Sequence, residues 1–233
     1  MIHPDIQQAL ARERSGTFVA EAEAGRRARQ ARLARRRAKR SRPFATSRRV
    51  VLRDGSTVVI RPVRSADAPL LADGFARLSD RSRRMRFLGR KDQLSPAELR
   101  YFTDVDHHDH EALGAVAHAS GGGVGIARYV RDRDDPHAAE IAVTIVDDWQ
   151  GRGLGTELLA RLSCRARAEG IHRFTALVAD DNMAMAGLLR NMSAYLVGRS
   201  PGSVEYEIPL MPRAKSTATP AGNPGQERVR TPC

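Results

Sequence analysis

The sequence predicts an α+β fold in which a central mixed, mostly antiparallel sheet is flanked by helices. Two observations carry this prediction. Strand-like alternation and helix-like periodicity both occur between residues 46 and 211, in the order βααβββαβαββ. A glycine-rich turn over Ser120–Gly123 also joins two apolar runs in the manner of a β-hairpin.

The first half of this region predicts one strand and two helices. Thr57–Val63 alternates and contains Val58, Val59 and Ile60, which favours a strand. A helix is expected over Ser65–Ser79, because Ser65 can cap it and apolar residues recur at helical spacing. A second helix is expected over Ser95–Tyr101, with Ser95 as its cap and a proline at its first position.

The second half predicts six strands and two helices. The expected strands are Ala112–His118, Val124–Val130, Ala138–Val146, Phe174–Val178, Ala194–Val197 and Val204–Ile208. An amphipathic helix is expected over Gly153–Glu169, where leucines share one face and Gly170 follows as a C-cap. The last expected helix is Asn182–Arg190.

Most of the formal net charge of +12 comes from one segment. Arg26–Arg42 holds ten Arg or Lys residues and no acid, and the rest of the chain has 29 basic against 27 acidic residues. We therefore expect a basic disordered arm over 1–45, a folded domain over 46–211, and a disordered tail over 212–233 that is rich in Pro, Ser and Thr. The arm could bind nucleic acid or an anionic surface, but the charge does not define the folded domain.

The chain has no apolar run of the roughly 18–20 residues that cross a bilayer, and charged residues at 12–14 interrupt any secretory signal. A disulfide between Cys164, in an expected helix, and the terminal Cys233 is not expected. No Cys/His spacing is typical of a metal site. A cytoplasmic protein without a bound metal is therefore expected.

The stretch most informative for function is Ile141–Thr156, which reads as a strand, an acidic turn, three glycines at alternate positions and a helix. Glycines let a ligand approach bare backbone N–H groups, and a helix N-terminus favours an anion. Arg152 adds a positive charge beside them. The pattern predicts a phosphate or pyrophosphate site, but it is neither a P-loop, because no lysine follows Gly155, nor a GxGxxG fingerprint.

Gln150-Gly151-Arg152-Gly153-Leu154-Gly155 matches the Q/R-x-x-G-x-G/A signature of the GNAT superfamily of acyl-CoA-dependent N-acyltransferases, and the chain resembles this family over residues 48–210. The resemblance implies acetyl-CoA or a related acyl-CoA as donor, a V-shaped opening between two strands, and no metal. The cofactor-binding residues that it implies are Ile145, Val146, Gln150, Gly151, Arg152, Gly153, Leu154, Gly155, Thr156 and Asn182.

Within the family, the chain is similar to bacterial protein lysine acetyltransferases that modify acyl-CoA synthetases. The matching stretches are Ala139–Val143, His107–Leu113 and Asp180–Asn182. The resemblance implies Glu140 as the general base, and an amine of pKa near 10.4 does need one at neutral pH. The competing interpretation is a surface Glu140 that is paired with Arg128 or Arg131.

Two departures from the family pattern lie in the expected helix Asn182–Arg190 and in the turn that follows it. Gly187–Arg190 lacks the tyrosine that many members use to protonate the thiolate, so the thiolate leaves unprotonated or another group serves. Asn191–Ala194 replaces the usual glycine after this helix. The cluster His107–His110 is interpreted mainly as a polar loop, although it could line the acceptor site, as could Tyr129 and Asp106.

Three functions remain open from the sequence. The first is transfer of an acetyl group to a protein lysine by direct, general-base-assisted attack, with an acyl-CoA synthetase as an example of the acceptor. The second uses the same cofactor with a small amine as acceptor. The third is a nucleic-acid-associated binding protein with a degenerate GNAT domain.

Overall fold

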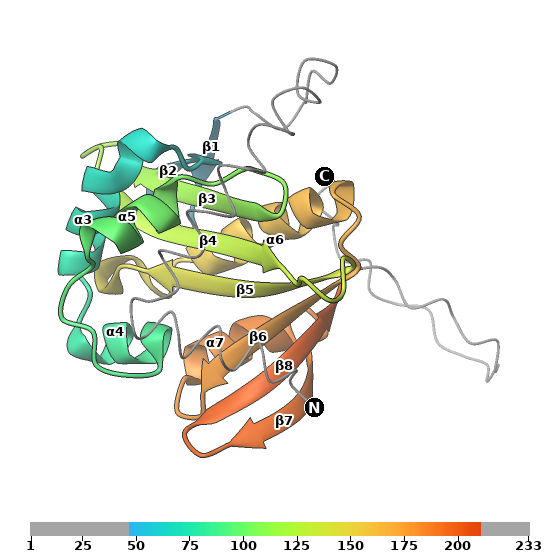
Figure 1. Ribbon diagram of the computed structural model, residues 1–233. Helices are drawn as coiled ribbons and strands as arrows, with labels where there is room; N and C mark the ends of the chain where they lie inside the picture. The colour runs from blue at the N-terminus through green and yellow to red at the C-terminus, as the bar shows by residue number, and fades with distance from the viewer. Residues whose placement is uncertain (1–46, 211–233) are drawn as a thin grey trace, which may run out of the picture.

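The computed structural model describes residues 47–210, which form one eight-stranded sheet with helices on both faces (Figure 1). The strands are β1 (Arg48–Val51), β2 (Thr57–Pro62), β3 (His110–Ala117), β4 (Gly123–Arg131), β5 (Ala138–Ile145), β6 (Arg173–Ala179), β7 (Tyr195–Ser200) and β8 (Ser203–Pro209). The helices are α3 (Ala68–Ala76), α4 (Asp80–Phe87), α5 (Pro96–Thr103), α6 (Leu154–Ala168) and α7 (Met183–Arg190), with 3-10 turns at η1 (Ser65–Asp67) and η2 (Asp147–Trp149). The predicted arm, tail and domain boundaries lie outside the described residues.

The strands follow the order β1-β2-β3-β4-β5-β6-β8-β7 across the sheet. Every neighbouring pair is antiparallel except β5 and β6, which run parallel because α6 crosses over between them. Figure 1 shows α3 and α5 on one face of the sheet and α6 on the other. The predicted fold class is confirmed.

The capping signal at Ser95 and the turn signal at Ser120–Gly123 act as expected. Ser65 does not cap a helix as predicted, because it begins the 3-10 turn η1 and α3 starts only at Ala68. Ser95 caps α5 by accepting a hydrogen bond from the N–H of Glu98 at 3.2 Å, and the Glu98 carboxylate accepts from the N–H of Ser95 at 2.8 Å. The β3–β4 hairpin closes through the Ala117 N–H, which donates to the carbonyl of Gly122 at 2.9 Å. Gly121 in this turn has a φ of 71°.

β1 and α4 are the two elements that the sequence analysis did not predict. β1 is only four residues long, and its turn into β2 includes Gly55 at a φ of 83°. α4 carries four arginines in eight residues and no fully buried side chain, so it lacks an apolar stripe. The available signals were the Asp54-Gly55 pair, typical of a hairpin, and the N-cap Ser79, whose hydroxyl accepts from the Ser82 N–H at 3.2 Å.

The apolar face of α6 fixes this helix against the sheet. Leu154, Leu158, Leu159 and Leu162 are each no more than 1% exposed, and they share one cluster with alternate residues of β4, β5 and β6. Each fully buried leucine contributes about 1.5–3 kcal/mol. The packing therefore holds the N-terminus of α6, which follows the glycine-rich loop, in a defined position beside β5.

β5 and β6 separate along their length. Their register ends at Glu140 opposite Thr175, after only three paired positions, although β5 continues to Ile145 and β6 to Ala179. β4 stays paired with β5 up to Ile145, and β8 stays paired with β6 up to Ala179. The sheet therefore opens into a V whose apex lies at Glu140 and Thr175.

The predicted absence of a disulfide between Cys164 and Cys233 falls outside the described residues, because Cys233 lies beyond residue 210. None of the helices between residues 47 and 210 has the length and apolar character needed to cross a membrane.

Candidate functional site

The V between β5 and β6 contains a cavity of about 440 Å3. Its walls come from both strands, from α4, from α7 and from the glycine-rich loop that precedes α6. Nine of the eleven residues predicted from the sequence to form the site line this cavity: Glu140, Ile145, Gln150, Gly151, Gly153, Leu154, Gly155, Thr156 and Asn182. Arg152 and Val146 do not line it.

Three glycines shape the loop for different physical reasons. Gly151 and Gly153 adopt left-handed backbone conformations, with φ of 74° and 89°, that strongly favour glycine. Gly153 is also the N-cap of α6, so the N–H groups that follow it have no acceptor within the helix. Gly155 serves packing, because a Cβ there would lie 3.1 Å from Leu188 of α7. The loop presents backbone donors at a helix N-terminus, which suits a pyrophosphate.

The side chain of Arg152 does not reach the cavity. Its guanidinium donates to the Asp54 carboxylate at 2.8 Å and to the Asp148 carbonyl, and it lies over the ring of Trp149 at 4.8 Å from the centroid. Arg152 therefore stabilises the loop. Two other arginines line the cavity: Arg86 of α4 and Arg53 of the β1–β2 turn. Arg53 could not be predicted from the sequence, because no local pattern links it to a loop about 100 residues later.

Backbone alternation decides which residues of β5 face the opening. The Val146 N–H donates to the carbonyl of Val124 in β4 at 3.0 Å, so the backbone groups of Val146 are directed toward β4. Since alternate residues point their backbone groups to opposite sides of a strand, those of Val143 and Ile145 face β6, where the pairing has ended. The N–H groups of Val143 and Ile145 are thus directed toward the opening, whereas the backbone of Val146, which was also predicted to bind the cofactor, is directed toward β4.

Glu140 occupies the apex of the cavity, on the face of the sheet opposite α6. The competing ion pair with Arg131 is not formed, because Arg131 donates to the Asp109 carboxylate at 2.8 Å and to the carbonyl of Glu169 at 2.9 Å. Arg128 is 5% exposed, lies over the ring of Phe102 and donates to its carbonyl oxygen at 3.2 Å.

Asn182 caps α7 at the opposite wall. Its side-chain oxygen accepts a hydrogen bond from the Met185 N–H at 3.0 Å, which leaves the side-chain amide group to face the cavity that Asn182 lines. Leu188 lines the cavity in the stretch that lacks the tyrosine of many family members. The hydroxyl groups among the lining residues belong to Ser82, Thr144 and Thr156.

α4 forms a wall that the sequence did not predict, and Asp147 holds it in place. The Asp147 carboxylate accepts from the Ser79 N–H at 3.0 Å, from the Ser79 hydroxyl at 2.7 Å and from the Ser82 hydroxyl at 2.8 Å. Burial opposes ionisation of Asp147, but these hydrogen bonds outweigh it and lower its pKa. Gln150 adds a contact on the other side of this turn, because its side-chain amide donates to the carbonyl of Ile145 at 3.1 Å.

The residues predicted to line an acceptor site, which are Tyr129, Asp106 and the cluster His107–His110, do not line this cavity. Tyr129 is fully buried and donates to the carbonyl of His108 at 3.0 Å, so its assignment to an acceptor channel is wrong. Asp106 accepts three backbone N–H bonds of its own loop, each 2.9 Å long. His107 and His108 contact the carboxylates of Glu111 and Glu169, and residues 47–210 contain no cluster able to hold a metal.

The fold and the cleft together define the class of acyltransferases with the GNAT fold. The chain matches the family model described as the acetyltransferase (GNAT) domain over residues 57–193. This match covers more than half of the chain, and the chain belongs to this family.

Several known proteins are similar to the chain. It is 33% identical over 181 residues to acetyltransferase Pat of Mycolicibacterium smegmatis, covering 78% of this chain and 54% of that protein. It is 37% identical over 139 residues to acetyltransferase PA5475 of Pseudomonas aeruginosa, covering 59% and 74% respectively. The crystal structure of the GNAT domain of S. lividans PAT superposes with a TM-score of 0.67 at 30% identity, covering 72% of this chain and 99% of that one. The chain thus spans about half the length of the M. smegmatis relative.

Proposed function

We propose that this protein transfers an acetyl group from acetyl-CoA to an amine, and that the amine is the ε-amino group of a lysine in a protein. The observation that carries the proposal is the cavity between β5 and β6, with Glu140 at its apex and the bare N–H groups of the glycine-rich loop along its wall. GNAT membership supports acetyl-CoA as donor. The similarity to acetyltransferase Pat supports a protein acceptor.

The residues present fit the cofactor. The N–H groups that follow Gly153 would hold the pyrophosphate, because they lack helical acceptors and lie at the positive end of the α6 dipole. Arg53 adds a positive charge beside them. The backbone of Val143 and Ile145 and the amide of Asn182 would hold the pantetheine arm, which orients the thioester toward the apex.

Glu140 supplies the proton transfer that aminolysis needs. A lysine amine is almost wholly protonated at neutral pH, so its nitrogen becomes a nucleophile only after losing a proton. The Glu140 carboxylate accepts this proton, directly or through a water, and the neutral nitrogen then forms a bond to the thioester carbonyl carbon. As the C–S bond breaks, the nitrogen loses its second proton to the leaving thiolate or to solvent, which leaves a neutral amide. The leaving thiolate has an ordinary pKa near 8.5, so it does not depend on a dedicated acid at neutral pH.

The proposal is tested by following release of the CoA thiol with an acyl-CoA synthetase as acceptor. We expect turnover with the wild-type chain, acetylation at a lysine detected by mass spectrometry, and loss of both in Glu140→Gln. Acetyl-CoA affinity, measured by calorimetry, serves as the control because Glu140→Gln leaves the glycine-rich loop intact. Turnover with free amines but with no protein acceptor would replace the protein lysine by a small amine, and absence of acetyl-CoA binding would contradict the whole proposal.

A further inference from the structure

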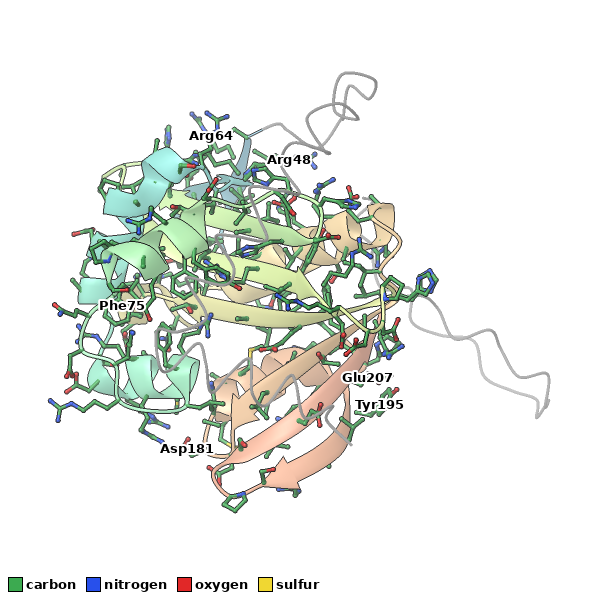
Figure 2. All side chains as sticks on the ribbon, in the orientation of Figure 1. Arg48, Arg64, Phe75, Asp181, Tyr195 and Glu207 are labelled. Atoms are coloured by element: carbon green, nitrogen blue, oxygen red, sulfur yellow. The ribbon has the colours of Figure 1, made fainter. Side chains whose placement is uncertain are left out.

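The two walls of the cavity are joined by an ion pair. The guanidinium of Arg84 in α4 donates to the carboxylate of Asp181, in the turn between β6 and α7, at 2.6 Å. Figure 2 shows Asp181 at the end of β6 that lies toward α4. The ion pair therefore connects the wall that α4 forms to the wall that β6 and α7 form.

Both members of this ion pair lie at the rim of the cavity. Their next neighbours in the chain, Met85 and Asn182, line the cavity, whereas Arg84 and Asp181 do not. The turn that holds Asp181 follows β6 at the end where β6 has separated from β5, and the glycine-rich loop follows β5 at the same end. A cofactor that binds this loop and reaches Glu140 would therefore cross the rim that the ion pair spans.

α4 is attached to the two walls in different ways. Its start is held on the side of β5 by three hydrogen bonds from Ser79 and Ser82 to the Asp147 carboxylate. On the side of α7, the side chains of Arg84 and Asp181 are 52% and 44% exposed. Because an exposed ion pair contributes little to folding stability, this one can open while the start of α4 stays in place.

The neighbouring charges favour the closed ion pair. Arg81 of α4 attracts the Asp181 carboxylate, and Asp180 attracts the Arg84 guanidinium. Two arginines of α4 thus face two aspartates of the β6–α7 turn. All four residues are exposed, so dissolved salt screens their attraction.

We propose that the Arg84–Asp181 ion pair is a strap that closes over bound CoA and limits how fast the cofactor enters and leaves the cavity. This inference rests on the proposed function, because it assumes that CoA occupies this cavity. The strap acts on cofactor exchange and not on the chemical step, since it lies at the wide end of the V and Glu140 lies at the apex. Closing elements of this kind set the rate of product release in many enzymes.

Trp149 provides a probe for these exchange rates, because it is the only tryptophan of the chain and it lines the cavity. Its fluorescence is followed by stopped flow after mixing the full chain with CoA over a range of concentrations. The slope of the observed rate against CoA concentration gives the association rate constant, and the intercept gives the dissociation rate constant.

The chain is compared as wild type, as Arg84→Gln, as Asp181→Asn and as the double variant. Either single change opens the strap, so we expect each to raise both rate constants about threefold and the double variant to raise them no further. The excess over the wild type should disappear at high salt. Arg90→Gln is the control and should match the wild type, because it breaks an exposed ion pair with Asp92, at 3.1 Å, that does not involve α7.

The two single variants also separate a strap from simple attraction of charge. CoA is an anion, so if each charge acted only on the ligand, Arg84→Gln would speed CoA dissociation and Asp181→Asn would slow it. A strap instead makes dissociation faster in both. Opposite signs would overturn the inference, as would effects that multiply in the double variant.

A second measurement separates exchange from chemistry. Acetyl transfer in a single turnover, from enzyme already loaded with acetyl-CoA, should have the same rate constant in all variants. A lower rate constant in Arg84→Gln and Asp181→Asn would overturn the strap, because the ion pair would then hold the reacting groups. Equal exchange rates in all variants would also overturn it and leave the transferase assignment standing, whereas absence of CoA binding in calorimetry would contradict both.

Discussion

Glu140 combines two properties at the residue scale: it is the last residue of β5 in register with β6, and it lines the cavity there. Replacing Glu140 by Gln keeps the size of the side chain and removes its ability to accept a proton. We expect kcat for acetyl transfer to fall by about 10²–10⁴-fold, the usual contribution of a general base, with little change in acetyl-CoA affinity. Single-turnover kinetics and calorimetry measure the two quantities separately. Unchanged kcat would assign the proton transfer to another group.

Gly153 combines a φ of 89° with a close neighbour, since a Cβ there would lie 3.2 Å from Nε of Arg53. Gly153→Ala should weaken acetyl-CoA binding at least tenfold, because it strains the N-cap that presents the N–H groups of the loop. The matched control is Gly170→Ala, which changes another left-handed glycine at the far end of α6, with φ of 78° and no atom within 4 Å of the added Cβ. Both variants should lose stability, but only Gly153→Ala should lose cofactor affinity in calorimetry.

At the scale of elements, the position of α4 is held by polar contacts more than by apolar burial. Asp147 accepts the hydrogen bonds from Ser79 and Ser82 that attach the start of α4 to the turn before the glycine-rich loop. Asp147→Ala should lower the free energy of unfolding by about 1–3 kcal/mol and raise KM for acetyl-CoA, because α4 lines the cavity. Denaturant titration and steady-state kinetics measure these effects. Asp148→Ala, which changes an exposed neighbour, is the control and should change neither.

The stability that the Asp147 carboxylate contributes to the folded protein depends on pH. The pKa of Asp147 lies below its ordinary value of 3.8 in the folded protein, because the three hydrogen bonds outweigh burial. The stability that the carboxylate contributes is therefore present above pH 3.8 and is lost as the pH falls through the folded pKa. The difference in stability between wild type and Asp147→Ala should shrink in that acidic range. A difference that stays constant would indicate a contribution independent of charge.

On the scale of the whole molecule, His108 connects the loop before β3 to the end of α6. Its ring nitrogen contacts the buried carboxylate of Glu169 at 2.5 Å, and this hydrogen bond raises the pKa of His108 above its ordinary 6.5. The resulting stability is complete below pH 6.5 and is lost as the pH rises through the folded pKa. His108→Gln should therefore reduce the melting temperature more at pH 6 than at pH 9. The exposed His118→Gln is the control and should show no such difference.

The parts of the fold and of the site that could be predicted from the sequence are those whose signal lies in consecutive residues. The glycine spacing after Ile145 specified the loop and its helix, because the motif lies in consecutive residues. Arg53 could not be predicted, since only the folded sheet brings the β1–β2 turn to Gly153. The orientation of Arg152 toward Asp54 also depends on that contact. Val146 was predicted in place of Val143 because the side of a strand that its backbone faces depends on pairing with β4.

The short parallel ladder between β5 and β6 has a mechanical consequence. Five strands lie on one side of it and three on the other, and only three residue pairs join the two groups within the sheet. Any change in the angle between these groups alters the width of the cavity most at its mouth and least at Glu140. A substitution in the ladder, such as at the buried Ala139, should therefore change the width of the cavity mouth while leaving Glu140 almost where it is.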